Sequence, residues 1–210
     1  MRVTLIYDDE VRKKDLIASH GFSCLVEAHG KMILFDTGAN GSILLHNMER
    51  LSIDPTLVEE VFISHAHGDH IGGLSDFLRV NPVKVYVPQS CSRPRGAEVI
   101  KVSKPLKLHE NIFSTGELRG IEQSLAVKTE KGLVVVVGCS HPGVRNILKA
   151  ASKFGEPYAI VGGLHGFKEF DLLKDLGLVC PCHCTYFKSK IRDLYPEKCI
   201  VGEAGVIITL

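Results

Sequence analysis

The sequence of 210 residues has no excess of charge of one sign and no long apolar run. Lys and Arg total 25 and Asp and Glu total 24, so the formal net charge is +1. This balance gives no reason to expect non-specific binding to nucleic acid or to an anionic membrane. Apolar runs such as Gly132–Gly138 are far shorter than the roughly 20 residues of a membrane-spanning helix. We therefore expect neither nucleic acid nor a membrane as a partner.

The cysteines do not form a disulfide framework, because there are seven of them and three crowd into residues 180–184. The segment Met1–Tyr7 runs straight into acidic residues and lacks the pattern of a secretory signal. Both features predict a reducing, cytoplasmic location. The length and a hydrophobic content of 45% predict a single globular domain over residues 1–210.

Short apolar runs alternate with helical patterns along the chain. Two hairpins are predicted, one joining residues 22–27 to 32–35 and one joining 123–129 to 133–137. The whole pattern predicts about ten to twelve strands and four or five helices, including helices over 167–176 and 186–194 and a strand over 199–201. Hairpins imply antiparallel pairs, so we expect an α/β fold with two packed sheets and helices outside, not one doubly wound parallel sheet.

Histidines gather just after apolar, strand-like runs. Six of the ten do so: His65, His67, His70, His141, His165 and His183. His65 and His67 stand two apart at a strand end, so their rings leave the same side. Gly68 permits a sharp turn, after which Asp69 and His70 can face the same space. Imidazoles and a carboxylate suit zinc, iron or manganese, and a solvated polar loop is the alternative.

The run His65-x-His67-x-Asp69-His70, followed by Gly72-Gly73, resembles the signature of the metallo-β-lactamase superfamily. Three further motifs support the resemblance in chain order: Phe35-Asp36-Thr37-Gly38, Gly138-Cys139-Ser140-His141 and Cys182-His183-Cys184. The resemblance covers essentially the whole chain. It implies a four-layer αβ/βα sandwich with a metal site at one edge between the sheets.

A closer resemblance is to one branch of metal-dependent hydrolases, which includes the archaeal dihydropterin-methyl-ribofuranosylaminobenzene phosphate synthases. It rests on Ser23–Glu27, Gly138–Gly143, Gly162–His165 and His183–Thr185. The chain departs from that branch by a shorter middle and by Tyr186, where glycine usually follows the His-Cys-Thr motif. Both departures touch the expected substrate pocket.

The resemblance implies two divalent metal ions, with zinc expected first and iron or manganese as alternatives. One ion would be held by His65, His67 and His141. The other would be held by Asp69, His70 and His183. Asp36 would accept an N–H from a ligating imidazole and fix its tautomer, although a plain turn carboxylate before Gly38 is the alternative.

The superfamily's bridging aspartate has no counterpart at the end of the strand-like run 160–163, which reads Ile-Val-Gly-Gly. Three alternatives remain: His165 replaces it as a ligand, the second ion binds weakly, or only water bridges the ions. His165 could equally be an acid or a buried, hydrogen-bonded histidine.

The sulfurs of Cys180, Cys182 and Cys184 are expected to share one face of an extended strand and pack as small apolar groups, with His183 pointing the opposite way into the site. Cys139, two residues before His141, is a candidate to line the pocket. His20, His29, His46 and His109 carry no comparable signal.

These residues predict a hydrolase that uses a metal-activated water on an ester or phosphoester of a small molecule. Asp69 would position the nucleophile or hold its proton, and His165 would protonate the leaving group. The alternatives are a transferase that joins a pterin-methyl diphosphate to an arylamine with release of diphosphate, as the branch resemblance implies, and a non-catalytic metal- or ligand-binding module.

A phosphorylated substrate is one candidate, because Pro142, Gly143 and Arg145 open a predicted helix whose free N–H groups could bind an anion at the edge of the site. Arg93 and Arg95 could add positive charge from a loop. An ordinary capped helix and a solvated basic loop are the alternatives.

Overall fold

The computed structural model describes residues 1–210 and contains two mixed sheets. The first sheet has the strand order β13 (Ile207–Thr209), β1 (Arg2–Tyr7), β2 (Ser23–Ala28), β3 (Lys31–Phe35), β4 (Glu60–Phe62), β5 (Lys84–Pro88) and β6 (Val99–Val102). The second has the order β12 (Leu178–Cys182), β11 (Pro157–Gly163), β10 (Gly132–Val137), β9 (Leu125–Thr129), β8 (Ile112–Ser114) and β7 (Leu106–His109).

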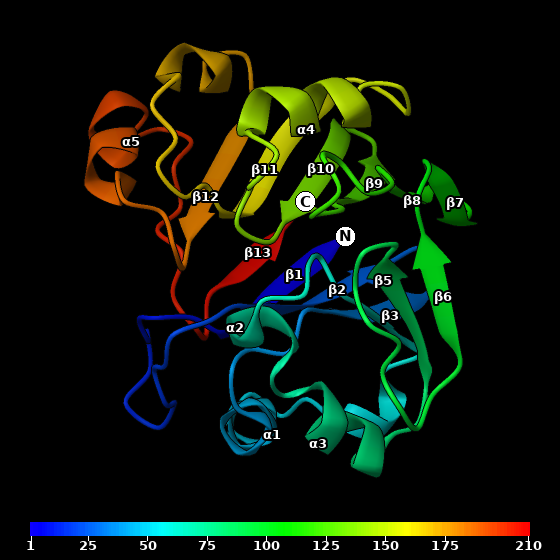
Figure 1. Cartoon of the computed structure of the whole chain (residues 1–210). Helices are drawn as coiled ribbons and strands as arrows, with labels where there is room; N and C mark the ends of the chain where they lie inside the picture. The colour runs from blue at the N-terminus through cyan, green and yellow to red at the C-terminus, as the bar shows by residue number, and fades with distance from the viewer.

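The helices lie on the outer faces of the two sheets (Figure 1). Helices α1 (Gly41–Arg50) and α3 (Leu74–Val80) cover the first sheet, and α4 (Val144–Ala151) and α5 (Lys188–Leu194) cover the second. The short helix α2 (Gly68–Ile71) lies beside the space between the sheets. Apolar side chains form one core between the sheets and one under each helical layer. The expected four-layer αβ/βα sandwich is confirmed.

Both predicted hairpins are present. Strand β2 pairs antiparallel with β3, and His29 and Gly30 take φ values of 51° and 72° in the turn between them. A two-residue turn with both φ values positive matches the twist of the strands it joins. Strand β9 pairs antiparallel with β10.

Parallel pairing in each sheet sets the position of the site. Strands β3 and β4 are parallel neighbours, as are β10, β11 and β12. The carboxyl ends of parallel neighbours meet at one edge. The loops that leave those ends carry the candidate residues Asp36, His65–His70, Cys139–His141, His165 and His183.

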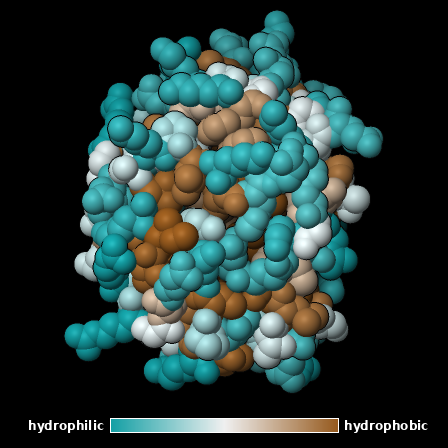
Figure 2. All heavy atoms as spheres, turned by 90° about the vertical axis from the view of Figure 1, so that its right-hand side faces the viewer, coloured by the Kyte–Doolittle hydropathy of each residue, from teal (hydrophilic) through white to brown (hydrophobic).

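At another edge of the sandwich, β6 and β7 end the two sheets, and Figure 2 shows hydrophobic surface there within a rim of hydrophilic residues. Ile100 and Leu106 are only partly buried against the core between the sheets. None of the helices is both long enough and apolar enough to cross a bilayer.

Three sequence predictions differ from the structure. The segment 167–176 contains only a 3-10 turn, Phe170–Leu173, in place of the predicted helix, and Leu173 and Leu176 are its buried leucines. Residues 199–201 make one isolated bridge, between Cys199 and Val179, in place of a strand. Helix α5 begins at Lys188, not at residue 186.

Phe35 lies in the core between the sheets and leads directly into Asp36. Its ring packs against Phe22 and is stacked on Phe62, with the latter centroids 5.5 Å apart. We predict that Phe35→Ala lowers the free energy of unfolding by about 3–5 kcal/mol, because the cavity cannot close fully. Urea denaturation measures this, with Leu57→Ala, at an exposed side chain, expected to change stability by less than about 0.5 kcal/mol. Equal effects of the two substitutions would contradict the assignment of Phe35 to the core.

Candidate metal centre

The rings of His65, His67 and His141 surround one point. Their centroids lie 4.6 to 4.8 Å apart, and His65 Nε2 is 3.1 Å from His67 Nδ1. His65 Nδ1 contacts the hydroxyl of Ser64 at 2.9 Å, so Nε2 is the nitrogen that faces the other rings. His141 Nε2 is buried and has no hydrogen-bond partner. A buried imidazole nitrogen without a hydrogen-bond partner, beside two other imidazoles, fits the role of a metal ligand.

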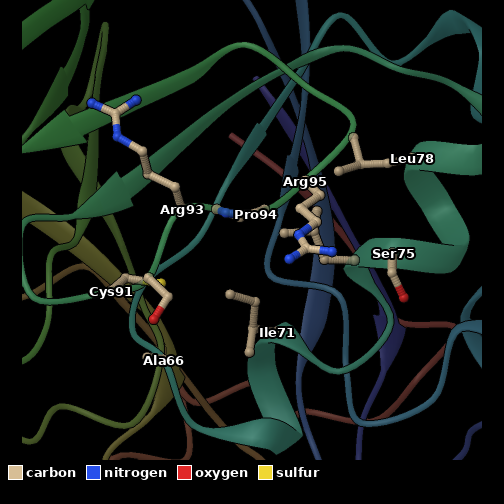
Figure 3. A pocket seen from close by; sticks show the side chains of 10 residues that line it. Ala66, Ile71, Ser75, Leu78, Cys91, Arg93, Pro94 and Arg95 are labelled. Carbon is tan, nitrogen blue, oxygen red and sulfur yellow. The ribbon is translucent and has the colours of Figure 1, made fainter.

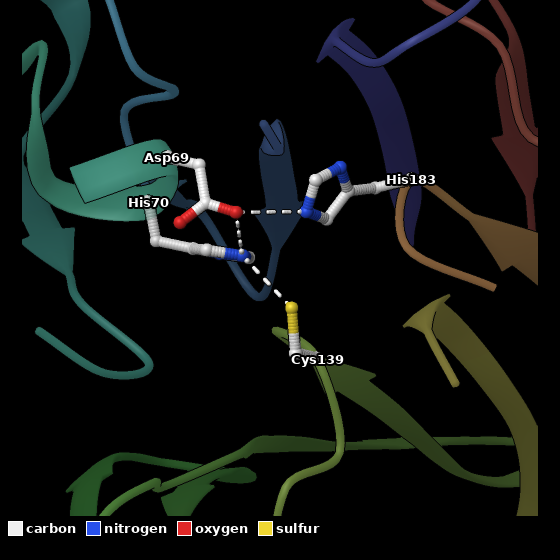
Figure 4. Close-up of side chains that lie close together, drawn as sticks. All are labelled: Asp69, His70, Cys139 and His183. Carbon is white, nitrogen blue, oxygen red and sulfur yellow. Dashed lines mark hydrogen bonds and ion pairs between the residues drawn. The ribbon is translucent and has the colours of Figure 1, made fainter. Parts of the chain in front are cut away.

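Asp69, His70 and His183 converge beside this first group (Figure 4). Asp69 Oδ2 is 3.1 Å from His183 Nε2 and 3.7 Å from His70 Nε2. Cys139 completes the group, since its Sγ lies 3.1 Å from His70 Nε2. The structure therefore brings together all six residues predicted as metal ligands, although they come from three separate loops.

Carboxylates orient two of these imidazoles by contacting the ring nitrogen that faces away from the cluster. Asp36 Oδ2 lies 2.7 Å from His70 Nδ1, and the same carboxylate accepts the hydroxyl and backbone N–H of Ser64. Asp9 Oδ1 lies 2.8 Å from His183 Nδ1. Each contact fixes the tautomer so that Nε2 points into the centre. Asp9 had no signal in the sequence, because its partner lies at the other end of the chain.

Glu122 holds the loop that carries Cys139 and His141. Its carboxylate is fully buried; Oε1 accepts the backbone N–H groups of Gly138, Cys139 and Ser140, and Oε2 accepts that of His141 at 2.8 Å. Burial raises the pKa of Glu122, and the N–H donors oppose the increase. No local motif marked this residue, which precedes β9 and reaches the loop only through the fold.

The electrostatics favour cation binding. Burial and the neighbouring imidazoles lower the pKa of His65, and the same causes lower the pKa of His141 to about 4. Both rings are therefore neutral at physiological pH and keep a lone pair for a metal. Burial alone would raise the pKa of Asp69, but charge on His70 and His183 lowers it, so it is a carboxylate. Nitrogen, oxygen and sulfur donors in one buried cluster fit a divalent transition metal.

His165 lies outside both ligand groups. Its ring centroid is 5.3 Å from that of His141, and the two side chains line a cavity of about 450 Å³. Gly143, at the start of α4, lines the same cavity, whereas Pro142 does not. The guanidinium of Arg145 is bound to Glu169, with Nε 2.8 Å from Oε2, so its charge is already partnered. Lys168 is the cationic side chain that lines this cavity.

A second cavity, of about 380 Å³, adjoins the histidine loop (Figure 3). Ala66, from between His65 and His67, and Ile71, next to His70, line it together with Arg93 and Arg95. The side chain of Arg93 points away from the cavity in Figure 3 and donates to the carbonyl of Val99.

The prediction for Cys184 is wrong. Cys180 and Cys182 pack in the core between the sheets, but β12 ends at Cys182 and His183 takes a φ of 40°. This left-handed turn breaks the alternation of the strand and sends Cys184 towards the site, where its Sγ lies 3.1 Å from that of Cys139. His20 also lies closer to the site than expected. Its Nδ1 is 3.4 Å from the carboxylate of Asp9, and its Nε2 is 3.4 Å from that of Asp69.

Fold and site together define an αβ/βα sandwich with a cluster of candidate metal ligands at one edge between its sheets. Residues 17–136, more than half of the chain, match the model of the metallo-beta-lactamase superfamily, and the chain belongs to that superfamily.

The chain is also similar to individual known proteins. The 7,8-dihydropterin-6-methyl-4-(beta-D-ribofuranosyl)-aminobenzene-5'-phosphate synthase of Methanocaldococcus jannaschii is 28% identical over 82% of this chain and 83% of its own length. A crystal structure of a metal-dependent hydrolase of the β-lactamase superfamily superposes with a TM-score of 0.82 at 27% identity, over 100% of this chain and 99% of the other. Zn(2+)-bound PqqB from Methylobacterium extorquens shares the fold, with a TM-score of 0.65 at 12% identity over the whole of both chains.

We predict that Glu122→Gln weakens the metal centre and the fold together. The amide would place an NH₂ group against backbone donors and lose the charge-assisted bonds, which costs about 1–3 kcal/mol. Urea denaturation and metal affinity measured by chelator competition should both decrease. Glu156→Gln, in the loop before β11, is the control. Unchanged metal affinity in Glu122→Gln would mean that the carboxylate does not position the loop.

Proposed function

We propose that this protein is a metal-dependent hydrolase with two divalent ions, zinc first and iron or manganese as alternatives, that cleaves an ester or phosphoester of a small molecule. One observation carries the proposal: ligand atoms from three separate loops converge in two adjoining groups, and one of them, His141 Nε2, is buried without a partner. When bound, the ions would make water nucleophilic at neutral pH and neutralise developing negative charge.

Asp69 is the candidate residue to orient the nucleophile and hold its proton. Its Oδ2 faces both His70 and His183, and the side chain is only partly buried, so solvent reaches it. The lowered pKa keeps it ionised, as a proton acceptor must be. His165 is the candidate acid for the leaving group, because it lies beside His141 and lines the adjoining cavity without belonging to either ligand group.

The side chains in and beside the cavity next to His141 favour a small, anionic substrate that contains a ring. Lys168 supplies positive charge, and the start of α4 at Gly143 and Val144 supplies backbone polarity. Tyr186 stands 5.2 Å from the ring of His165 and is 71% exposed, so its face is free to stack on a planar group. Arg145 is not among the residues that line the cavity, and its guanidinium is bound to Glu169, which does line it.

The second candidate function is the transferase reaction, in which an arylamine nitrogen displaces diphosphate from a pterin-methyl diphosphate. The likeness to the archaeal synthase over 82% of the chain favours it. Release of diphosphate only in the presence of an arylamine would support the transferase, and metal-dependent cleavage of generic esters or phosphodiesters would support the hydrolase. Tight ligand binding without turnover in the metal-loaded protein would support a non-catalytic module.

We predict that Asp69→Asn lowers kcat by roughly 100- to 10,000-fold, because the amide cannot accept the proton. The circular dichroism spectrum should stay that of the parent protein. Asp175→Asn, at an exposed carboxylate, is the matched control and should retain full activity. Comparable activity in Asp69→Asn and the parent would remove Asp69 from the reaction.

We also predict that the protein, expressed in metal-supplemented medium, carries about two transition-metal ions per chain. Elemental analysis after gel filtration measures this. Exhaustive chelation should abolish turnover, and readdition of zinc, iron or manganese should restore it with the native ion most effective. A protein that is fully active without bound metal would refute the proposal.

A further inference from the structure

Cys139 occupies the position between the two groups of candidate ligands. Its Sγ forms one group with Asp69, His70 and His183 and another with His65 and His141, and within each group all ligand atoms lie within 4.8 Å of one another. It is the only residue common to both groups. The side chain is 3% exposed, and its sulfur points at His70 Nε2, 3.1 Å away (Figure 4).

The end of β11 leaves the space between the two groups of candidate ligands to the sulfur of Cys139. The chain has glycine at 162 and 163, the strand end at which the family resemblance implies a bridging carboxylate. A Cβ atom on Gly163 would come within 2.7 Å of Cys184 Sγ and 2.5 Å of the carbonyl oxygen of Gly138. The space for a side chain at this strand end is therefore taken by Cys184 and by the loop that carries Cys139.

We propose that Cys139 is a metal ligand shared by the two ion positions, in place of the absent bridging carboxylate, and that Cys184 positions its sulfur. The inference rests on the metal centre of the proposed function and adds a donor to it. On binding, the S–H proton of Cys139 leaves to solvent, and a sulfur lone pair forms the bond to the cation.

Neighbouring groups hold this sulfur in place. The backbone N–H of Cys139 is bound to Glu122 at 3.2 Å, which fixes the main chain. The thiol of Cys184 donates to Cys139 Sγ at 3.1 Å. Such a donor stabilises negative charge on sulfur and tunes the strength of the metal bond. A thiolate among imidazoles favours zinc over magnesium or manganese.

Cobalt substitution tests the ligand directly. Apoprotein reconstituted with Co²⁺ should show an intense near-ultraviolet sulfur-to-cobalt charge-transfer band. Cys139→Ser should lose the band and bind Co²⁺ more weakly in chelator competition, whereas Cys199→Ser, outside both ligand groups, should keep both. A cobalt-loaded parent protein without the band, or a Cys139→Ser variant that retains it, would overturn the proposal.

Cys184 is tested by the energy of the same band. Cys184→Ala removes the donor, so the band should move to longer wavelength and Co²⁺ affinity should decrease roughly 10- to 100-fold. Cys184→Ser, which restores a donor, should return the band towards its original position. An unshifted band in Cys184→Ala would remove the positioning role.

X-ray absorption of the zinc-loaded parent protein needs no variant to fold. A sulfur scatterer at about 2.3 Å is expected, and a shell of nitrogen and oxygen alone would refute the assignment. These readouts are independent of turnover. A protein with sulfur ligation that hydrolyses no ester would keep this inference and refute the hydrolase proposal. A protein that hydrolyses esters without sulfur ligation would refute this inference and keep the hydrolase proposal.

Discussion

Two buried carboxylates hold the candidate metal centre together. Asp36 bonds Ser64 and His70, so it fixes both ends of the histidine loop, and Glu122 gathers four consecutive backbone N–H groups of the loop after β10. A buried charge is costly unless it is fully hydrogen-bonded. Each loop is therefore confined to the conformation that satisfies its carboxylate, and that conformation directs the imidazoles inward.

The sheets supply the second constraint. Because β3 and β4 run parallel in one sheet and β10, β11 and β12 in the other, their carboxyl ends deliver loops to one edge of the sandwich. The backbone then turns sharply at Asp36, Ser140, His165 and His183, each with a positive φ. Left-handed backbone at non-glycine residues is strained, and here it occurs where the chain leaves a strand to present a side chain to the site.

Much of this centre could be predicted from sequence because its signals are local. The spacing of His65, His67, Asp69 and His70 after an apolar strand indicates metal binding by itself, and the hairpins exclude a wholly parallel sheet. Asp9 could not be predicted, since its partner His183 is 174 residues away, and Glu122 could not be predicted, since it acts on backbone N–H groups that no sequence motif marks. Cys184 was misplaced because strand alternation was extended past Cys182, and only the turn at His183 shows where the strand ends.

The centre draws on both ends of the chain. The β1 strand leads into Asp8, which accepts the backbone N–H of His183 at 2.7 Å, and into Asp9, which holds that residue's ring. The candidate ligands His65, His67 and His141 all precede His183 in the sequence. Because Asp8 and Asp9 hold His183, the second group of candidate ligands is complete only when β1 and the turn after β12 are both in place.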